Sequence, residues 1–296
     1  MIKAIIRDFV FAVRDAYWRA LLRYSPILYI RHRYARLFGK EIDLDNPTTF
    51  AEKIQWLKCN DRDERIVKYA DKYLVREFVR ETIGEEYLVP MLFACDHAMD
   101  VRYEALPNRF VLKPNNSSGR VLICKDKTKL KEKEVFKTLK RWEKENLTKI
   151  TGEWVYERIP YKLICEEFLE DEIVDYKLYF AGGEFICTQV IAGRSKGWRQ
   201  FGYFDAEWKL LDIKRTGVNK LSEPLKKPER YEEMLEIATK LAQGFIFIRV
   251  DLYSVGEQIY FGELSFYPNN GFVRYETEEM DRFFSSKINL PIAEKQ

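Results

Sequence analysis

The sequence predicts an α+β protein that builds its sheets from antiparallel hairpins and begins with a mainly helical amino-terminal region. Three observations support this fold class. Amphipathic helical spacing dominates the first 84 residues. Beyond them, apolar runs of strand length follow one another across tight turns such as Gly182–Gly183, as in hairpins. The helical patterns among these runs are too few for the alternating series of a doubly wound parallel sheet.

The first 40 residues combine arginines with aromatic and aliphatic residues at helical spacing. They hold nine Lys or Arg against two Asp, a net charge of +7, whereas the whole chain carries +3. Such a local basic segment argues against a protein that binds nucleic acid. No run approaches the ~20 apolar residues of a membrane-spanning helix, and no secretory signal is expected. Two interpretations stay open: an amphipathic helix on an anionic membrane surface, or a helix that packs on the protein body.

Two amphipathic helices are expected next. The first follows an Asn-Pro turn and a threonine cap within residues 43–58, and it places Phe50, Ile54 and Leu57 on one side. The second is a single helix over residues 64–84 that ends at Gly84. Its apolar stripe consists of Val67, Ala70, Leu74, Val75 and Val79.

Strand-like runs and two further helices fill the rest of the chain. The helix over residues 132–146 presents Val135, Leu139 and Trp142 on one stripe. The helix over residues 228–244 has proline at its start and glycine at its end. The expected strands lie within residues 87–92, 109–114, 120–126, 162–170, 174–193, 198–211 and the hairpin of residues 250–268.

Two carboxylates face each other on the last hairpin. With a turn near Glu257, Asp251 lies opposite Glu263 and Arg249 opposite Ser265, all on one face because side chains alternate. Opposed like charges destabilise a strand pair by up to ~1 kcal/mol. Either a divalent cation such as Mg²⁺ lies between the two acids, or Arg249 neutralises them on a solvated polar face.

Other candidate groups precede this hairpin. Lys113 ends a strand before a loop of small residues, whose backbone N–H groups can approach phosphate oxygens. The loop does not match the GxxxxGK[ST] pattern of a P-loop, and an ordinary hairpin loop is the alternative. The strand with Glu166 and Glu167 either presents backbone groups to an adenine edge or turns its acids outward at a sheet edge.

Charged residues on the following strands add to the candidates. Asp175 and Lys177 share one strand face. Arg194 and Arg199 follow in a Gly/Ser-containing loop, where they either clamp a phosphate or carboxylate or face solvent. Only two histidines occur, which argues against a multi-histidine metal site and a Ser-His-Asp triad. Five scattered cysteines without a CxxC pair favour neither disulfides nor zinc, and they suit a reducing cytoplasm.

The order of these motifs resembles the ATP-grasp superfamily. Lys113 with its loop, Glu-Glu-Phe-Leu, Asp-x-Lys, Arg-x-Asp and Glu-x-Ser follow one another. The fuller run, from "NPTTFAEKIQWLK" through "FVLKPNNSSG" to "YFGELSF", is similar to its teichuronopeptide-biosynthesis branch, over roughly residues 40–285. This resemblance implies two α+β subdomains whose antiparallel sheets sandwich ATP. The expected divisions are a basic helical segment 1–40, a helical region 41–105, and subdomains 106–170 and 171–290.

The resemblance also implies the roles of individual residues. Lys72, Lys113 and Lys177 would contact phosphates, Glu166 the adenine amino group, and Glu170 the ribose. Glu167 and Leu169 would offer backbone groups to the nucleotide. Ser265 stands where most of the superfamily has Asn, so either its hydroxyl or an amide from Asn269 or Asn270 would complete the metal site. Arg249 would stabilise charge on the reaction intermediates. The loop expected to close over the triphosphate comprises Asn115, Asn116, Ser117, Ser118 and Gly119. The expected Mg²⁺ ligands are Asp251, Glu263, Ser265 and Asn269, and the expected catalytic residues are Arg249, Lys177, Arg194 and Arg199.

The implied activity is that of an ATP-dependent carboxylate–amine ligase that uses Mg²⁺ and forms an acylphosphate. Its implied substrates are an amino acid and a small-molecule or lipid-linked sugar, joined at a uronic acid or amino sugar of a bacterial surface polysaccharide such as capsule or O-antigen. The protein would be cytoplasmic, with or without contact between residues 1–40 and the inner face of the membrane. Specificity is expected from loops around residues 145–160, 193–203 and 214–228.

Three alternative functions remain. An ATP-grasp kinase would phosphorylate a sugar hydroxyl with the same ATP site. A glycosyltransferase would use a DxD pattern, which occurs at Asp43-Leu44-Asp45 and Asp61-Arg62-Asp63. A catalytically inactive membrane adaptor is the reading without enzymatic activity, and it is disfavoured by the presence of Lys113, Glu166, Arg249, Asp251 and Glu263.

Overall fold

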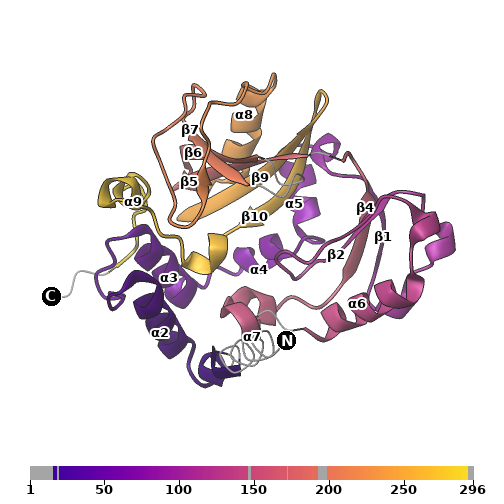
Figure 1. Cartoon of the computed structure of the whole chain (residues 1–296), viewed down its shortest axis with the longest axis horizontal. Helices are drawn as coiled ribbons and strands as arrows, with labels where there is room; N and C mark the ends of the chain where they lie inside the picture. Colours follow the sequence, from indigo (N-terminus) through magenta and orange to yellow (C-terminus); the bar gives the residue numbers. More distant parts are fainter. Residues whose placement is uncertain (1–15, 19, 146–147, 172, 193–198, 293–296) are drawn as a thin grey trace, which may run out of the picture.

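Two sheets face each other across the middle of the molecule, with helices around them (Figure 1). The computed structural model describes residues 16–18, 20–145, 148–171, 173–192 and 199–292. The expected α+β architecture, with two sheets that are antiparallel almost throughout, is confirmed. Besides the elements introduced below, the described chain contains α7 (Thr148–Thr151), α9 (Glu278–Ser285) and the 3₁₀ turns η1 (Glu85–Tyr87), η2 (Ala98–Asp100), η3 (Tyr103–Ala105), η4 (Lys127–Lys129), η5 (Trp154–Glu157) and η6 (Pro268–Gly271).

The smaller sheet has four antiparallel strands in the order β1-β4-β2-β3. Helix α6 (Glu132–Lys144) covers one face, where its predicted stripe packs against alternate residues of β2 and β4. The other face carries Val111, Lys113 and Glu166, because side chains alternate along a strand. Strand β1 lies before residue 106, so the smaller sheet combines a strand from the expected helical region 41–105 with strands from the expected subdomain 106–170. The strands are β1 (Met91–Cys95), β2 (Phe110–Pro114), β3 (Leu122–Cys124) and β4 (Leu163–Glu167).

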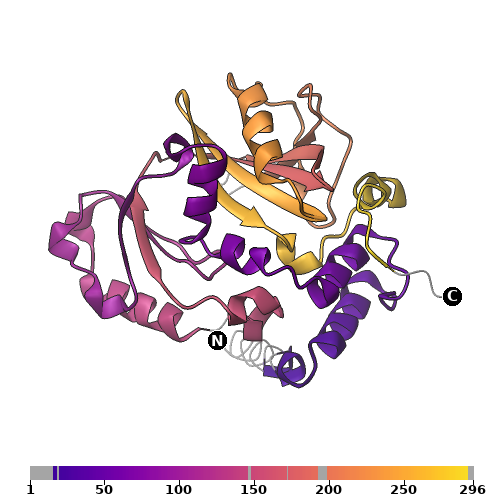
Figure 2. The same ribbon diagram turned by 180° about the vertical axis from the view of Figure 1, so that it is seen from behind.

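The larger sheet has six strands in the order β10-β9-β5-β6-β7-β8, antiparallel except for the short β7–β8 pair. Helix α8 (Tyr231–Leu241) lies against one face (Figure 2), where Leu178, Ile248 and Val250 are fully buried. The opposite face carries the polar residues of the central strands and turns towards the smaller sheet. The strands are β5 (Val174–Ala181), β6 (Glu184–Ala192), β7 (Gln200–Phe204), β8 (Asn219–Lys220), β9 (Phe247–Val255) and β10 (Gln258–Ser265).

A β-bulge sets the register of the β9–β10 hairpin. Next to the turn, Phe261 pairs with Leu252, but beyond Gly262 the register shifts so that Glu263 pairs with Asp251. The extra residue changes which side chains of β10 face the core. Ile259 and Phe261 are buried before the bulge, and Leu264 and Phe266 after it. The predicted pairing of Asp251 with Glu263 is thus confirmed, through a bulge that the alternation alone did not indicate.

The expected single helix over residues 64–84 is wrong, because the chain forms α4 (Arg65–Ala70) and α5 (Val75–Thr82) with a break between them. At the break, one Asp71 carboxylate oxygen accepts the backbone N–H groups of Tyr73 and Leu74. The other accepts the Asn115 amide at 2.9 Å. This distant bond favours the turn over a continuous helix, and Leu74 of the predicted stripe is exposed.

The amino-terminal helices pack on the body of the protein. Helix α2 (Pro26–Phe38) begins after Ser25, which caps it, and buries Tyr29 and Tyr34 in a cluster that includes α3 (Phe50–Asn60). Helix α3 starts at the predicted threonine cap, Thr49, and buries the predicted apolar side. The packed arrangement therefore holds for residues 26–38, whereas residues 1–15 lie outside the described residues. Among the described helices, none combines the length and apolar character that a membrane crossing requires.

Candidate active site

Two adjoining cavities lie between the two sheets. The more apolar one has a volume of about 570 Å³ and is lined by Val111 and Ile123 of the smaller sheet and by Tyr253 of the larger one. The more polar one has a volume of about 440 Å³ and lies beside the carboxyl end of β10. Ile191 lines both, so the two cavities are neighbours. An elongated ligand with one apolar and one charged end suits this pair of cavities.

A row of charged residues crosses three strands of the larger sheet beside the polar cavity. Lys177 of β5 pairs in register with Asp251 of β9, which pairs in turn with Glu263 of β10. The Lys177 ammonium forms a buried ion pair with the Asp251 carboxylate. Alternating positions on neighbouring strands bring these groups together although 74 residues separate the first two. The row therefore follows directly from strand order and register.

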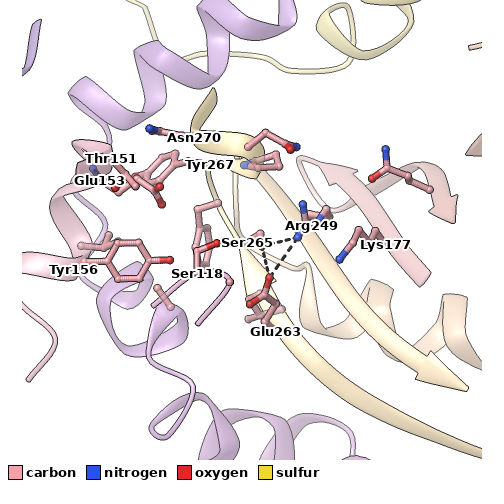
Figure 3. A pocket seen from close by; sticks show the side chains of 18 of the residues that line it. Ser118, Thr151, Glu153, Tyr156, Lys177, Arg249, Glu263, Ser265, Tyr267 and Asn270 are labelled. Carbon is pink, nitrogen blue, oxygen red and sulfur yellow. Dashed lines mark hydrogen bonds and ion pairs between the residues drawn. The ribbon is translucent and has the colours of Figure 1, made fainter. Parts of the chain in front are cut away.

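Arg249 joins the charges of this row (Figure 3). Its guanidinium donates to both Asp251 oxygens at 2.6 and 2.7 Å, to Ser265 Oγ at 3.0 Å and to Glu263 Oε1 at 3.4 Å. Burial by itself would lower the pKa of Arg249, but Asp251, together with Tyr179 and Glu263, outweighs burial and raises it. Arg249 consequently remains charged, and it neutralises the opposed acids of the hairpin in the way that one sequence interpretation anticipated.

Lys72 lies in the break between α4 and α5, and its side chain reaches Glu263 of the charged row. Its ammonium lies 3.3 Å from Glu263 Oε2 and donates to the Ser117 carbonyl at 2.5 Å. Burial by itself would raise the pKa of Glu263, but Lys72, Arg249 and Lys177 outweigh it and lower the pKa to about 2. Glu263 is thus a carboxylate at neutral pH, and it lines the cavity.

The predicted phosphate loop divides into an anchored part and a part that lines the cavity. The Asn115 amide bonds Asp71 and the Pro160 carbonyl, and the Asn116 amide donates to the Ile159 carbonyl at 3.3 Å. The buried Ser117 hydroxyl donates to the Pro114 carbonyl at 3.2 Å. Ser118 and Gly119 line the polar cavity. Of the five predicted loop residues, the last two therefore line one of the two cavities described above, and the other three do not.

Lys113 and Glu166 pair with each other across the smaller sheet, where both line the apolar cavity. Lys113 Nζ lies 2.6 Å from Glu166 Oε2, and Arg76 of α5 lies 3.4 Å from Glu166 Oε1. The sequence reading did not include Arg76, because α5 is distant from this strand along the chain. The Glu167 N–H donates to the Pro90 carbonyl at 3.0 Å. The remaining predicted nucleotide residues, Glu167, Leu169 and Glu170, line the same cavity.

Three of the four predicted Mg²⁺ ligands line the polar cavity, namely Glu263, Ser265 and Asn269. Asp251 is only 2 % exposed, and its carboxylate is held by Lys177 and Arg249. The oxygens present, from carboxylate, hydroxyl and amide, are the hard donors that Mg²⁺ prefers, so the residues fit this ion. Within the described part of the chain, no cluster of three or more His, Cys, Asp or Glu side chains could hold a metal. A magnesium ion here would therefore need oxygen atoms of a bound small molecule in addition to those of the protein.

Several cavity residues were not identified from the sequence as site residues. Glu153, Tyr156 and Arg215 all line the polar cavity, from the segments 145–160 and 214–228 in which specificity was expected. They lie in stretches without a helical or strand period, so no pattern singled them out. Of the two predicted loop arginines, Arg199 lines the cavity, and Arg194 lies outside the described residues.

The two DxD patterns take part in local turns. Asp43 accepts the backbone N–H groups of Asp45 and Asn46, at 2.9 and 2.8 Å. Asp61 accepts the N–H of Asp63, whose carboxylate pairs with a neighbouring arginine. Neither pattern lines the two cavities between the sheets. The geometry therefore gives the glycosyltransferase alternative no support.

Comparisons with known proteins support the ATP-grasp resemblance. A family model described as TupA-like ATPgrasp matches residues 52–289. Among solved structures, a D-alanine–D-alanine ligase from Bacillus anthracis in complex with ATP is 16% identical at a TM-score of 0.39, with 67% of this chain and 53% of that chain covered. The corresponding ligase from Helicobacter pylori is 16% identical at a TM-score of 0.42, covering 81% and 69%.

N5-carboxyaminoimidazole synthetase from Staphylococcus aureus is 15% identical at a TM-score of 0.39, with 72% of this chain and 50% of that chain covered. The chain thus spans about half the length of this enzyme and of the Bacillus anthracis ligase. A search of curated proteins gave no match.

Proposed function

Because the chain belongs to the TupA-like ATP-grasp family, we propose that it is an ATP-dependent, ADP-forming ligase that joins a carboxylate to an amine. The observation that carries this proposal is the charged row Lys177–Asp251–Glu263 with Arg249, which borders a polar cavity between the two sheets. Phosphoryl transfer asks mainly for positioned positive charge around the transferred group. No protein nucleophile is required for this chemistry.

The two cavities support a specific placement of ATP. The adenine would occupy the apolar cavity beside Glu166, whose carboxylate would accept from the adenine amino group. Glu167 and Leu169 would offer backbone groups, and Glu170 would hold the ribose. The phosphates would extend past Lys113 towards Ser118 and Gly119, where short residues allow close approach of backbone N–H groups.

Binding of the triphosphate would change the ion pairs of the site. Lys113, Lys177 and Lys72 each hold a protein carboxylate in the structure. We propose that the phosphates take over these ammonium groups, which would free Asp251 and Glu263 to hold Mg²⁺ together with oxygens of Ser265 or Asn269. The ion would offset the negative charge that develops on the transferring phosphoryl group. Asp251 and Glu263 thus neutralise lysines in the structure and would hold the metal once ATP is bound.

The carboxylate substrate would enter at the end of the polar cavity that contains Arg199 and Arg215. Arginine matches a carboxylate with two parallel N–H donors, so this end suits an anionic substrate. One oxygen of the substrate would attack the γ-phosphate of ATP and release ADP. Arg249 would stabilise the resulting acylphosphate, and the amine would then displace phosphate to form the amide.

For the substrates, we propose a uronic acid or amino sugar of a bacterial surface polysaccharide together with an amino acid. The TupA-like family assignment and the cationic end of the cavity support this class. The reaction would take place in the cytoplasm, where ATP is supplied. Arg31 is exposed one turn after the exposed Ile27 of α2, and Tyr24 just before the helix is exposed as well, which supports contact with an anionic membrane. Unchanged binding to anionic vesicles after deletion of residues 1–30 would refute that contact.

The decisive experiment measures ADP release by the full chain with MgATP. Uronic acids are combined pairwise with amino acids, and amino acids with amino sugars, while a coupled assay follows ADP and mass spectrometry follows the amide. We expect ADP release that requires both a carboxylate and an amine. Glu263→Gln should reduce the rate by at least ~100-fold. The substitution removes a charged side chain that would hold the Mg²⁺ ion beside the transferring phosphoryl group.

A matched control lies on the same hairpin. Glu257 occupies the exposed turn, so Glu257→Gln should leave the rate unchanged. ADP release that yields a stable phosphate ester on a sugar hydroxyl, with no amide, would establish the kinase alternative instead. A melting shift with a nucleotide sugar and none with ATP would favour a glycosyltransferase.

A further inference from the structure

The charges around the polar cavity are distributed unevenly. Figure 3 shows Arg249 and Lys177 on one side, and Glu153, Thr151 and Tyr156 on the other, with Glu263 and Ser265 between them. Arg199 and Arg215 add two further cations to the lining. Besides Glu263, which is held by Lys72 and Arg249, Glu153 is the acidic residue that lines this cavity among the described residues.

Glu153 is buried, with 8 % of the residue exposed, and yet it borders the cavity. A carboxylate is rarely this buried unless a partner compensates its charge. Burial raises the pKa of Glu153. The positive charge of Lys58 and a hydrogen bond between the side chains of Thr151 and Glu153 both oppose this rise. Lys58 donates its own hydrogen bonds to the Asn270 carbonyl at 3.2 Å and to Asn270 Oδ1 at 2.7 Å, so it acts on Glu153 through its charge rather than through a direct bond. Among the described residues, no side-chain nitrogen of Lys, Arg or His lies within 4.0 Å of the Glu153 carboxylate.

We propose that Glu153 binds the acceptor amine in its protonated form and takes a proton from it, so that the amine becomes the nucleophile. This inference rests on the ligase activity proposed above. It assigns the two sides of the cavity to different substrates. The cationic side receives the phosphates and the carboxylate, and the side of Glu153 receives the ammonium group. A primary aliphatic amine, such as an amino acid or amino sugar, is the acceptor class that this arrangement fits.

The protons balance in two transfers. The ammonium group gives one proton to the Glu153 carboxylate, and the free nitrogen lone pair attacks the acyl carbon of the acylphosphate. The C–N bond forms and the C–O bond to phosphate breaks, which carries the electron pair away on phosphate. The nitrogen loses its second proton to the leaving phosphate. Glu153 then returns its proton to solvent, so no oxidant, reductant or additional reactant is involved.

The charged and titratable groups around Glu153 come from several elements. Lys58 of α3 and Lys72 favour its ionised form, whereas Glu263 of β10 opposes it. Its negative charge also acts on the phenols of Tyr156 and Tyr267. Burial is the strongest influence and raises the pKa of Glu153 above its ordinary value. A carboxylate shifted in this direction is a better proton acceptor than a solvent-exposed one at neutral pH.

The test separates acylphosphate formation from the attack of the amine. Hydroxylamine is largely unprotonated at neutral pH, so it traps an acylphosphate as a hydroxamate without needing a base. With the carboxylate and amine that give the highest rate in the substrate panel, Glu153→Gln should keep hydroxamate formation within about threefold of wild type. Its kcat/KM for the amine should fall by about 10²–10⁴-fold at pH 7.

The pH profile provides a second readout that a purely structural role would not move. The amide-forming kcat/KM of Glu153→Gln should rise with pH across the range in which the amine itself loses its proton, and approach that of wild type at high pH. Glu153→Asp should restore part of the rate at pH 7. Glu157, which is exposed in the same segment, gives the matched control Glu157→Gln with unchanged kinetics.

Each outcome bears on the inference. If wild type forms neither hydroxamate nor amide with any substrate pair, the proposed ligase function fails. If wild type is active and Glu153→Gln keeps its kcat/KM for the amine within twofold, the inference about Glu153 is overturned and the ligase function stands. Equal loss of hydroxamate and amide, together with loss of the ATP-induced melting shift, would also overturn it, because Glu153 would then only support the fold.

Discussion

Arg249 should contribute more to stability than other arginines of the chain, because it compensates two carboxylates beneath the cavity. Arg249→Met removes two contacts to Asp251, at 2.6 and 2.7 Å, and one to Glu263 at 3.4 Å. Asp251 is 2 % exposed and, among the described residues, would keep Lys177 as its cationic partner. Removal of one partner from a buried ion pair costs about 3–5 kcal/mol, so we expect a loss of this size in the free energy of unfolding.

Urea is the suitable denaturant for this measurement, because guanidinium is itself a salt that screens charges. The matched control is Arg80→Met, since Arg80 pairs with an exposed Glu85 at 3.2 Å and should cost at most ~1 kcal/mol. A loss below ~1 kcal/mol for Arg249→Met would refute the reasoning.

Three further outcomes are expected. Lys113→Met should weaken MgATP binding by about 10–100-fold in calorimetry, since a charged hydrogen bond contributes about 1.5–3 kcal/mol; unchanged affinity would place the phosphates elsewhere. The pKa of Glu263 is lowered to about 2 in the fold from an ordinary 4.5, so its stabilising contribution is complete above that ordinary value and is lost as pH falls towards 2. Glu263→Gln should therefore flatten the pH dependence of unfolding between pH 5 and 2, and an identical slope would contradict this. Gly271→Ala should lower the free energy of unfolding in urea more than Gly217→Ala does. Both glycines have positive φ, but only at Gly271 would the new Cβ lie 2.6 Å from Gln55 Nε2. Equal losses in the two variants would count against that clash.

The sequence predicts well what local periodicity and strand register determine. Alternation along β9 and β10 predicts that Asp251 lies opposite Glu263, and helical spacing predicts the buried stripe of α6. The bulge at Gly262 is harder to foresee, because it depends on which residues of β10 the core can accommodate. The predicted pairing arises only because this bulge shifts the register by one residue before Glu263.

Contacts between distant segments explain what the sequence reading missed. The break between α4 and α5 depends on a bond from Asp71 to Asn115, and helical propensity carries no information about that bond. The pairing of Lys177 with Asp251 requires the order of strands, which the sequence does not state. Glu153 follows a glycine in an irregular segment, where neither a period nor a motif marks it. These sites emerge only when the chain is folded.

The internal ion pairs of the site also bear on which anions a cell can offer it. Lys72, Lys113, Lys177 and Arg249 each hold a carboxylate of the protein itself. Orthophosphate, sulfate or a stray carboxylate would have to displace an internal counter-ion while making only one set of contacts. Under the proposed placement of ATP, a nucleotide would displace several internal counter-ions and would gain contacts along both cavities in return. The internal counter-ions would then raise the affinity that a small anion needs to bind, and would favour ATP over free phosphate.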